Sequence, residues 1–208
     1  MRERELQRMN KFVIYIHGKG GSAEEAAHYV PLFPDSSVIG FDYKAETPWD
    51  AKSEFPAYFD AVRGAYNTVS VIANSIGAFF AMHALGNSRI EQAYFISPIV
   101  DMEKLITDMM SWANVTEDEL REKQQIEMSF GETLSWQYLC YVRNHPVKWA
   151  VPTHILYGEK DHLTSLETIS AFAAKTGAAL TVMPSGEHWF HTAAQMAFLD
   201  EWIKGAEK

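Results

Sequence analysis

The sequence predicts an α/β fold, a doubly wound and mostly parallel sheet of about six strands with helices on both faces and a short helical cap insertion. Short apolar runs alternate with longer helical patterns, as in such sheets. The alternation is interrupted once, between Pro98 and Pro152. Because 47% of the 208 residues are hydrophobic, the chain can bury a sizeable core. We therefore expect one domain over residues 1–208, with a peripheral N-terminal extension (1–10) and a cap or lid insertion (99–151).

Six buried or alternating runs are expected to form the strands. They cover residues 12–16, 38–43, 69–72, 93–97, 153–157 and 179–183. Helical patterns cover 23–29, 49–66 and 78–85, and a final helix extends to Ile203. Ser22 and Glu25 have the spacing of a capping box at the start of the first helix, and Thr116 and Glu119 have it inside the insertion. In parallel sheets, function gathers where the strands end.

The segment Ala73-Asn74-Ser75-Ile76-Gly77 joins a strand to a helix. A serine at such a turn takes a strained conformation, and the residues two before and two after it must be small. Ala73 and Gly77 meet that requirement. The Ser75 hydroxyl would then project from the sheet, and the Ile76 N–H would point at a developing oxyanion. The simpler alternative is that Asn74 and Ser75 only cap the helix.

This segment resembles the nucleophile elbow of the α/β-hydrolase family, with Ala73 in place of the first glycine of G-x-S-x-G. The loop His17-Gly18-Lys19-Gly20-Gly21 follows the first strand and resembles the family's oxyanion loop. The resemblance implies that the Lys19 N–H is the second oxyanion donor beside Ile76, with His17 supporting the loop. The glycines lack the spacing of a P-loop or a dinucleotide site, which disfavours a nucleotide ligand.

Two later loops carry the remaining candidate residues. Asp161 follows strand 153–157, and His188 follows strand 179–183. Taken alone, Asp161 suits a turn and His188 a helix start. The order Ser, Asp, His is that of the α/β-hydrolase family, and the resemblance implies a nucleophile at Ser75, a base at His188 and an orienting acid at Asp161. Weaker rivals are His162, His191, Glu159 and Glu187.

The insertion is rich in methionine and aromatic residues. Related hydrolases carry a cap over the active site at this point of the chain. The aromatic residues either close a small core of the insertion itself or line an apolar acyl or aryl pocket. On the second interpretation, the candidate pocket residues are Met109, Trp112, Trp136 and, outside the insertion, Trp189.

Charge and cysteine content argue against several classes of partner and of site. The net charge of −9, from 18 Lys and Arg against 27 Asp and Glu, argues against nucleic acid and anionic membranes. The lone Cys140 cannot form an intramolecular disulfide, and no Cys/His cluster has zinc-site spacing. Residues 1–10 are charged and lack the apolar core of a signal peptide. We expect a cytoplasmic protein without metal; the oligomeric state is left open.

The favoured function is a serine hydrolase that cleaves an ester or thioester of a small carboxylic acid through an acyl-enzyme. Its partner is then a small-molecule ester, and the mechanism implies no cofactor. An amide substrate is less favoured, and an Asp-nucleophile dehalogenase is disfavoured because a serine occupies the elbow. The alternative is a catalytically silent α/β-hydrolase-fold module that binds a small ligand or a protein partner.

Overall fold

The computed structural model describes residues 11–64, 68–86, 89–129 and 131–207. The extension predicted for residues 1–10 lies outside this part of the chain. Two compact units are distinguished: a main unit, Met1–Val100 with Lys148–Lys208, and an insertion unit, Asp101–Val147. The insertion unit lies within the range 99–151 proposed from the sequence.

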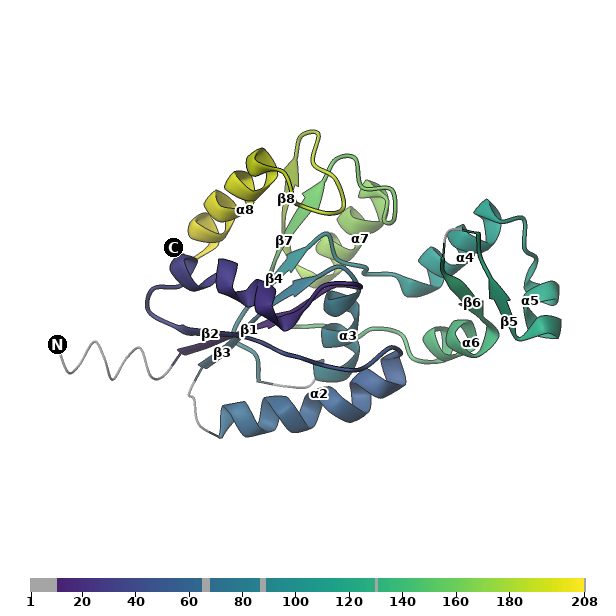
Figure 1. Cartoon of the computed structure of the whole chain (residues 1–208), viewed down its shortest axis with the longest axis horizontal. Coiled ribbons are helices and arrows are strands. Elements are labelled where there is room, and N and C mark those ends of the chain that lie inside the picture. Colours follow the sequence, from purple (N-terminus) through teal and green to yellow (C-terminus); the bar gives the residue numbers. More distant parts are fainter. Residues whose placement is uncertain (1–10, 65–67, 87–88, 130, 208) are drawn as a thin grey trace. The chain divides into compact units, whose positions relative to one another are not determined.

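The main unit contains a six-stranded sheet in the order β2-β1-β3-β4-β7-β8 (Figure 1). All neighbouring strands are parallel, which confirms the predicted sheet. The chain moves outward from β1 to β2 and then returns to β3 on the other side of β1. Loops at the carboxyl ends diverge at such a switch point, which favours a site there. The strands are β1 (Lys11–Ile16), β2 (Ser37–Gly40), β3 (Thr68–Asn74), β4 (Ala93–Ile96), β7 (Thr153–Gly158) and β8 (Ala179–Met183).

Helices cover both faces of this sheet, as predicted (Figure 1). One face packs against the 3-10 helices η1 (Ala23–His28) and η2 (Val30–Leu32) and against α8 (Ala193–Ala206). The other face carries α2 (Pro48–Arg63) and α3 (Ile76–Leu85), whose Phe55 and Phe80 rings lie 6.4 Å apart. Helix α7 (Leu166–Thr176) packs beside β7 and β8.

Three local predictions need correction. Residues 23–28 form a 3-10 helix in which Ser22 makes no side-chain cap, and the Glu25 carboxylate accepts a hydrogen bond from Tyr15. The strand predicted to reach residue 43 ends at Gly40, where a Cβ would lie only 1.9 Å from the Ala23 carbonyl oxygen. The helix predicted to reach residue 66 ends at Arg63, and residues 65–67 lie outside the described part.

The insertion unit is not entirely helical. It contains α4 (Met102–Trp112), α5 (Glu117–Lys123) and α6 (Trp136–Asn144), together with an antiparallel pair, β5 (Gln125–Glu127) and β6 (Thr133–Ser135). Arg143 joins the three helices through ion pairs with Glu103 and Glu117, at 2.7 and 2.8 Å. Among the described residues of this unit, the buried side chains are aliphatic or methionine, and they include Ile106, Met110, Leu120, Leu134 and Leu139. Among the described residues, no helix is long and apolar enough to cross a membrane.

Candidate active site

Ser75 sits at the sharp turn between β3 and α3. Its φ of 52° and ψ of −120° are unfavourable for a residue with a side chain and typically cost about 1–3 kcal/mol. Three backbone hydrogen bonds hold this conformation. The Ser75 N–H donates to Ile96 O at 3.0 Å, and the Ser75 carbonyl accepts from Ala78 N and Ile99 N at 3.1 and 3.2 Å. The surrounding backbone thus holds the strained turn in place.

Two glycines allow the loop after β1 to lie directly against this turn. A Cβ on Gly77 would lie 2.4 Å from the His17 carbonyl oxygen, so only glycine fits without a shift. A Cβ on Gly18 would lie 3.2 Å from the Ser75 Cβ. The segment His17-Gly18-Lys19-Gly20-Gly21-Ser22, named the oxyanion loop from here on, therefore passes beside the candidate nucleophile.

A line of hydrogen bonds connects the three candidate catalytic side chains. Ser75 Oγ lies 2.8 Å from His188 Nε2, and His188 Nδ1 lies 2.7 Å from Asp161 Oδ2. The Asp161 side chain is fully buried, whereas that of His188 is 21% exposed. A carboxylate that accepts from Nδ1–H leaves Nε2 free to accept the serine proton. The geometry is thus suited to proton transfer from Ser75 to His188.

Asp161 also forms the turn that the simpler interpretation of this residue predicted. Its Oδ1 accepts from Leu163 N at 2.8 Å and from Thr164 N at 3.2 Å. These bonds fix one carboxylate oxygen, while the other remains bound to His188. The two interpretations of Asp161 are therefore compatible.

The loops after β7 and β8 are held together before they reach Asp161 and His188. Lys160 N donates to Gly186 O at 2.7 Å, and Ser185 N donates to a Glu159 carboxylate oxygen at 2.8 Å. A Cβ on Gly158 would lie 2.4 Å from Glu187 O. Glu159, weighed as a rival acid, thus ties one loop to the other.

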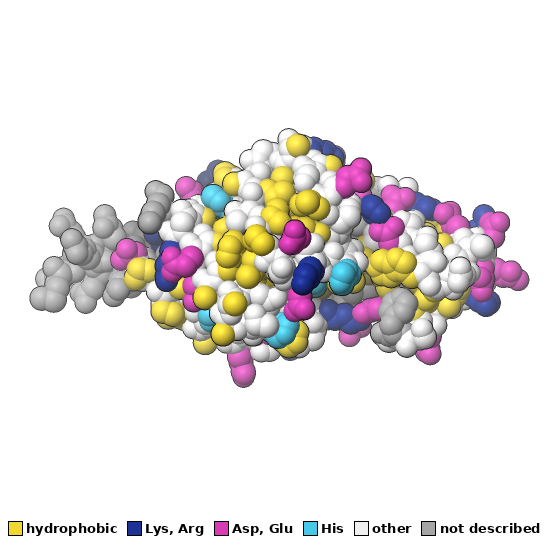
Figure 2. All heavy atoms as spheres, turned by 90° about the horizontal axis from the view of Figure 1, so that it is seen from above, with side chains coloured by type: hydrophobic (Ala, Val, Ile, Leu, Met, Phe, Trp, Pro, Cys, Tyr) yellow, Lys and Arg dark blue, Asp and Glu magenta, His cyan; other side chains and the backbone are white. Residues whose placement is uncertain are grey.

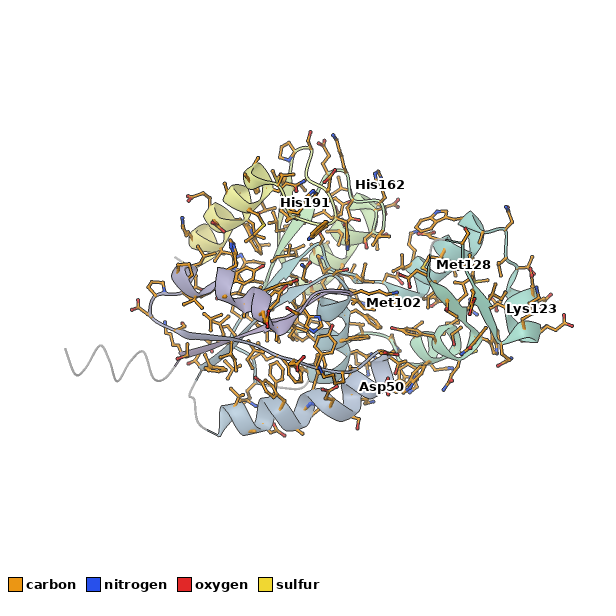
Figure 3. The ribbon with its side chains drawn as sticks, viewed as in Figure 1. Asp50, Met102, Lys123, Met128, His162 and His191 are labelled. Carbon is orange, nitrogen blue, oxygen red and sulfur yellow. The ribbon has the colours of Figure 1, made fainter. Side chains whose placement is uncertain are left out.

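The rival histidines have other surroundings. His191 Nδ1 lies 2.8 Å from Trp189 O, and its ring stacks on Trp189 with a centroid distance of 4.4 Å. His162 is exposed on the loop that follows Asp161. Figure 3 shows His162 and His191 on the loops that follow β7 and β8. The histidine that the structure brings to Ser75 is His188.

Comparison with known proteins identifies the fold. No protein-family model and no curated protein sequence matches the chain. Among solved structures, an alpha-beta serine hydrolase homologue from Coxiella burnetii is 13% identical, with a TM-score of 0.62 over 97% of this chain and 86% of that one. The chain has the α/β-hydrolase fold. Two other proteins with higher TM-scores have the same arrangement.

The first is Est1E from Butyrivibrio proteoclasticus. It is 16% identical, with a TM-score of 0.74 over 97% of this chain and 88% of that one. A structure of Est1E with bound ferulic acid gives 17% identity and a TM-score of 0.71 over 96% and 89%. The second is a candidate hydrolase from Agrobacterium vitis S4, 15% identical, with a TM-score of 0.75 over 97% and 90%. At these identities the likeness concerns the fold alone.

Within this α/β-hydrolase fold, the two predicted oxyanion donors belong to α3 and to the oxyanion loop. Ile76 is the first residue of α3, where backbone N–H groups have no partner within the helix. Lys19 is exposed in the oxyanion loop. His17 steadies that loop: its ring stacks on Tyr43 at 4.3 Å, and its carbonyl accepts from the Tyr43 hydroxyl at 2.8 Å. That Lys19 and Ile76 act as donors stays a prediction.

Gln195 is a residue that the sequence interpretation missed. It is only 5% exposed, and its Oε1 accepts from His191 N at 3.1 Å and from Thr192 N at 3.2 Å. Its Nε2 donates to Glu187 at 3.4 Å. Gln195 thus closes the loop that carries His188. The signal was present, because Thr192-x-x-Gln195 is a capping box at the start of α8.

The four candidate pocket residues belong to different units. Trp189 is in the main unit, directly after His188, and is 68% exposed. Met109 and Trp112 are on α4, and Trp136 begins α6, in the insertion unit. Figure 2 shows hydrophobic side chains gathered in the middle of one face of the main unit, with charged and histidine side chains at their border. A joint pocket stays a prediction.

Across the described ranges, no group of three or more His, Cys, Asp or Glu side chains is placed to hold a metal ion.

Proposed function

We propose that the chain is a serine hydrolase that cleaves an ester or thioester of a small carboxylic acid. The observation that carries this proposal is the line from Asp161 through His188 to Ser75, with bonds of 2.7 and 2.8 Å, at a strained turn. A module that only binds a ligand has no physical need for this arrangement. The likeness to an alpha-beta serine hydrolase homologue adds support.

In the first half of the proposed reaction, Ser75 Oγ attacks the substrate carbonyl carbon. The new C–O bond forms as the hydroxyl proton passes to His188 Nε2, and the carbonyl π electrons move to its oxygen. The N–H groups of Lys19 and Ile76 stabilise this oxyanion. Asp161 holds the imidazole in the required tautomer and stabilises the imidazolium. The tetrahedral intermediate then collapses, and the leaving alcohol or thiol takes the proton from His188.

Water completes the reaction. His188 accepts a proton from the water molecule as its oxygen attacks the acyl carbon, and a second tetrahedral intermediate forms. When the bond to Ser75 Oγ breaks, His188 returns the proton to that oxygen. The carboxylic acid leaves, and the enzyme is restored.

The acid part of the substrate is proposed to be apolar and aromatic or short-chained. Est1E, which shares the fold, has been solved with ferulic acid bound, and ferulic acid is a small aromatic carboxylic acid. Trp189 offers a flat exposed face directly after His188. We propose that it contacts the substrate.

Covalent labelling tests the proposed function. We expect a fluorophosphonate to label Ser75 stoichiometrically, as located by mass spectrometry, and some nitrophenyl ester to be hydrolysed. Ser75→Ala should abolish labelling and lower turnover by about 10⁶-fold. Ser97→Ala is the matched control, because Ser97 is a second strand-end serine with positive φ (44°); it is buried, and its Oγ has no hydrogen-bond partner among the described residues.

The outcomes separate the two functional classes. Labelling of wild type and Ser97→Ala, with none of Ser75→Ala, supports a serine hydrolase. If the folded wild-type protein is not labelled and hydrolyses no ester in a series of increasing acyl length, the silent binding module replaces this proposal.

A further inference from the structure

Glu25 departs from the local pattern of its sequence. In a capping box, the Glu25 carboxylate would bond to the backbone N–H of Ser22. Here, Ser22 makes no side-chain cap, and the carboxylate accepts a hydrogen bond from the hydroxyl of Tyr15. Tyr15 is 1% exposed, whereas Glu25 is exposed. Departures from local preference are expected at functional sites.

The Glu25 carboxylate is packed against the oxyanion loop. A Cβ added to Gly21 would lie 2.9 and 3.0 Å from its two oxygens, so the carboxylate rests on the Gly21 backbone. In the same loop, Gly21 N donates to Gly18 O at 3.2 Å, which closes the turn that contains Lys19. Glu25 therefore contacts one end of this turn, and Gly18, beside Ser75, forms the other.

Tyr15 links this contact to the nucleophile. It lies on β1, near the point where the strand leads into the oxyanion loop. It pairs with Ile72 of β3, the strand that ends at Asn74, the residue before Ser75. Burial raises the pKa of Tyr15 well above its ordinary value, so the hydroxyl keeps its proton and continues to donate to Glu25.

We propose that Tyr15 and Glu25 are positioning residues. They hold the oxyanion loop at the position beside Ser75 that lets the Lys19 N–H reach the developing oxyanion. This inference rests on the proposed function. An oxyanion donor is effective only within about 2.7–3.1 Å of the developing charge, so a small displacement of the loop weakens it. The loss should appear in the chemical step rather than in substrate binding.

Tyr94 provides a matched control. It lies in register with Tyr15 across the sheet, because Ile72 of β3 pairs with both tyrosines. Tyr94 is fully buried, and its hydroxyl donates to the exposed Glu207, which follows α8. Tyr94→Phe therefore removes the same group from the same depth of the core and from the same kind of partner. It leaves the oxyanion loop untouched.

The kinetic test compares Tyr15→Phe with Tyr94→Phe. We expect Tyr15→Phe to lower kcat and the rate constant of fluorophosphonate labelling about tenfold while KM changes less than about twofold. Tyr94→Phe should remain within about twofold of wild type. Glu25→Gln keeps an acceptor oxygen and should retain most activity, whereas Glu25→Ala should resemble Tyr15→Phe. Equal losses in the two tyrosine variants, or labelling of Tyr15→Phe at the wild-type rate, would overturn the inference.

Amide hydrogen exchange gives a measurement that does not depend on activity. In Tyr15→Phe, amides of the oxyanion loop should exchange about two- to tenfold faster, the effect of one lost hydrogen bond. They should be unchanged in Tyr94→Phe. If wild type labels normally and the loop exchanges equally in both variants, the inference falls and the proposed function stands. If wild type is never labelled, the proposed function falls, and with it the positioning role in catalysis.

Discussion

The two halves of the site are built differently. The half that carries Ser75 is part of the core: Val71, Ala73 and most of α3 are buried, and Ser75 is held by backbone bonds. The other half, called the surface half, consists of the two loops that follow β7 and β8; most of their residues are exposed or half-buried, whereas the Asp161 side chain is buried. Its loops are held by backbone hydrogen bonds together with side chains that accept from backbone N–H groups, among them Glu159 and Gln195.

This difference predicts different responses to substitution. In the core half, packing and reactivity depend on the same atoms, so a change at Gly77 would disturb both. In the surface half, a polar side chain can be removed without disturbing the strained turn at Ser75. Activity and stability should therefore separate in the surface half, and the four predictions below test that comparison in order of decreasing effect.

Asp161→Asn should have the largest effect on the surface half. The amide cannot stabilise an imidazolium and favours the wrong tautomer of His188, so kcat should fall by about 10⁴-fold. Because the amide oxygen can still accept from Leu163 N and Thr164 N, the turn should persist. Steady-state kinetics and a thermal melt measure the two effects. A loss of less than tenfold would mean that Asp161 is only a turn former.

Gln195→Ala should lower kcat about tenfold by loosening the loop that carries His188. The carboxamide's half of the α8 capping box is lost as well, so the control is Thr116→Ala, which removes the side-chain cap of α5 in the insertion unit. Each should cost about 1 kcal/mol of stability. Only Gln195→Ala should reduce activity; equal activities would contradict the positioning role.

Trp189→Ala should weaken binding of aryl esters selectively. One lost aromatic contact is worth about 0.5–1.5 kcal/mol, so KM for a naphthyl ester should rise about two- to tenfold while that for an ethyl ester stays constant. Val30→Ala, at another exposed apolar residue of the main unit, is the control. The same selective loss in Trp112→Ala would place the insertion unit at the substrate. An equal rise for both esters would argue against an aryl contact at Trp189.

The difference in stability between Ser75→Gly and Ser75→Ala addresses the core half and is the smallest effect expected. Both Ser75→Gly and Ser75→Ala remove the nucleophile, but glycine tolerates φ of 52° and ψ of −120°. Ser75→Gly should therefore be more stable than Ser75→Ala by about 1 kcal/mol, measured by denaturant unfolding. Equal stabilities would show that the turn stores no strain.

The sequence predicted the sheet and the three candidate catalytic residues because each signal is local. Ser75, Asp161 and His188 each follow an apolar strand, and parallel strands bring their carboxyl ends to one edge. The capping box at Ser22 and Glu25 was predicted wrongly because its signal is also local, while the partner that Glu25 takes in the structure is Tyr15 on β1. The pair β5 and β6 was missed because its strands are three residues long and show no clear period.

The sequence by itself thus determined the six strands of the main sheet, the turn at Ser75 and the strand ends that carry Asp161 and His188. These follow from periodicity and from the size of neighbouring residues. Only the tertiary structure decided that Glu25 bonds to Tyr15 and that Gln195 closes the loop of His188. The physical reason is that a polar side chain with several possible partners bonds to the one that folding brings nearest, and residues distant in sequence set that distance.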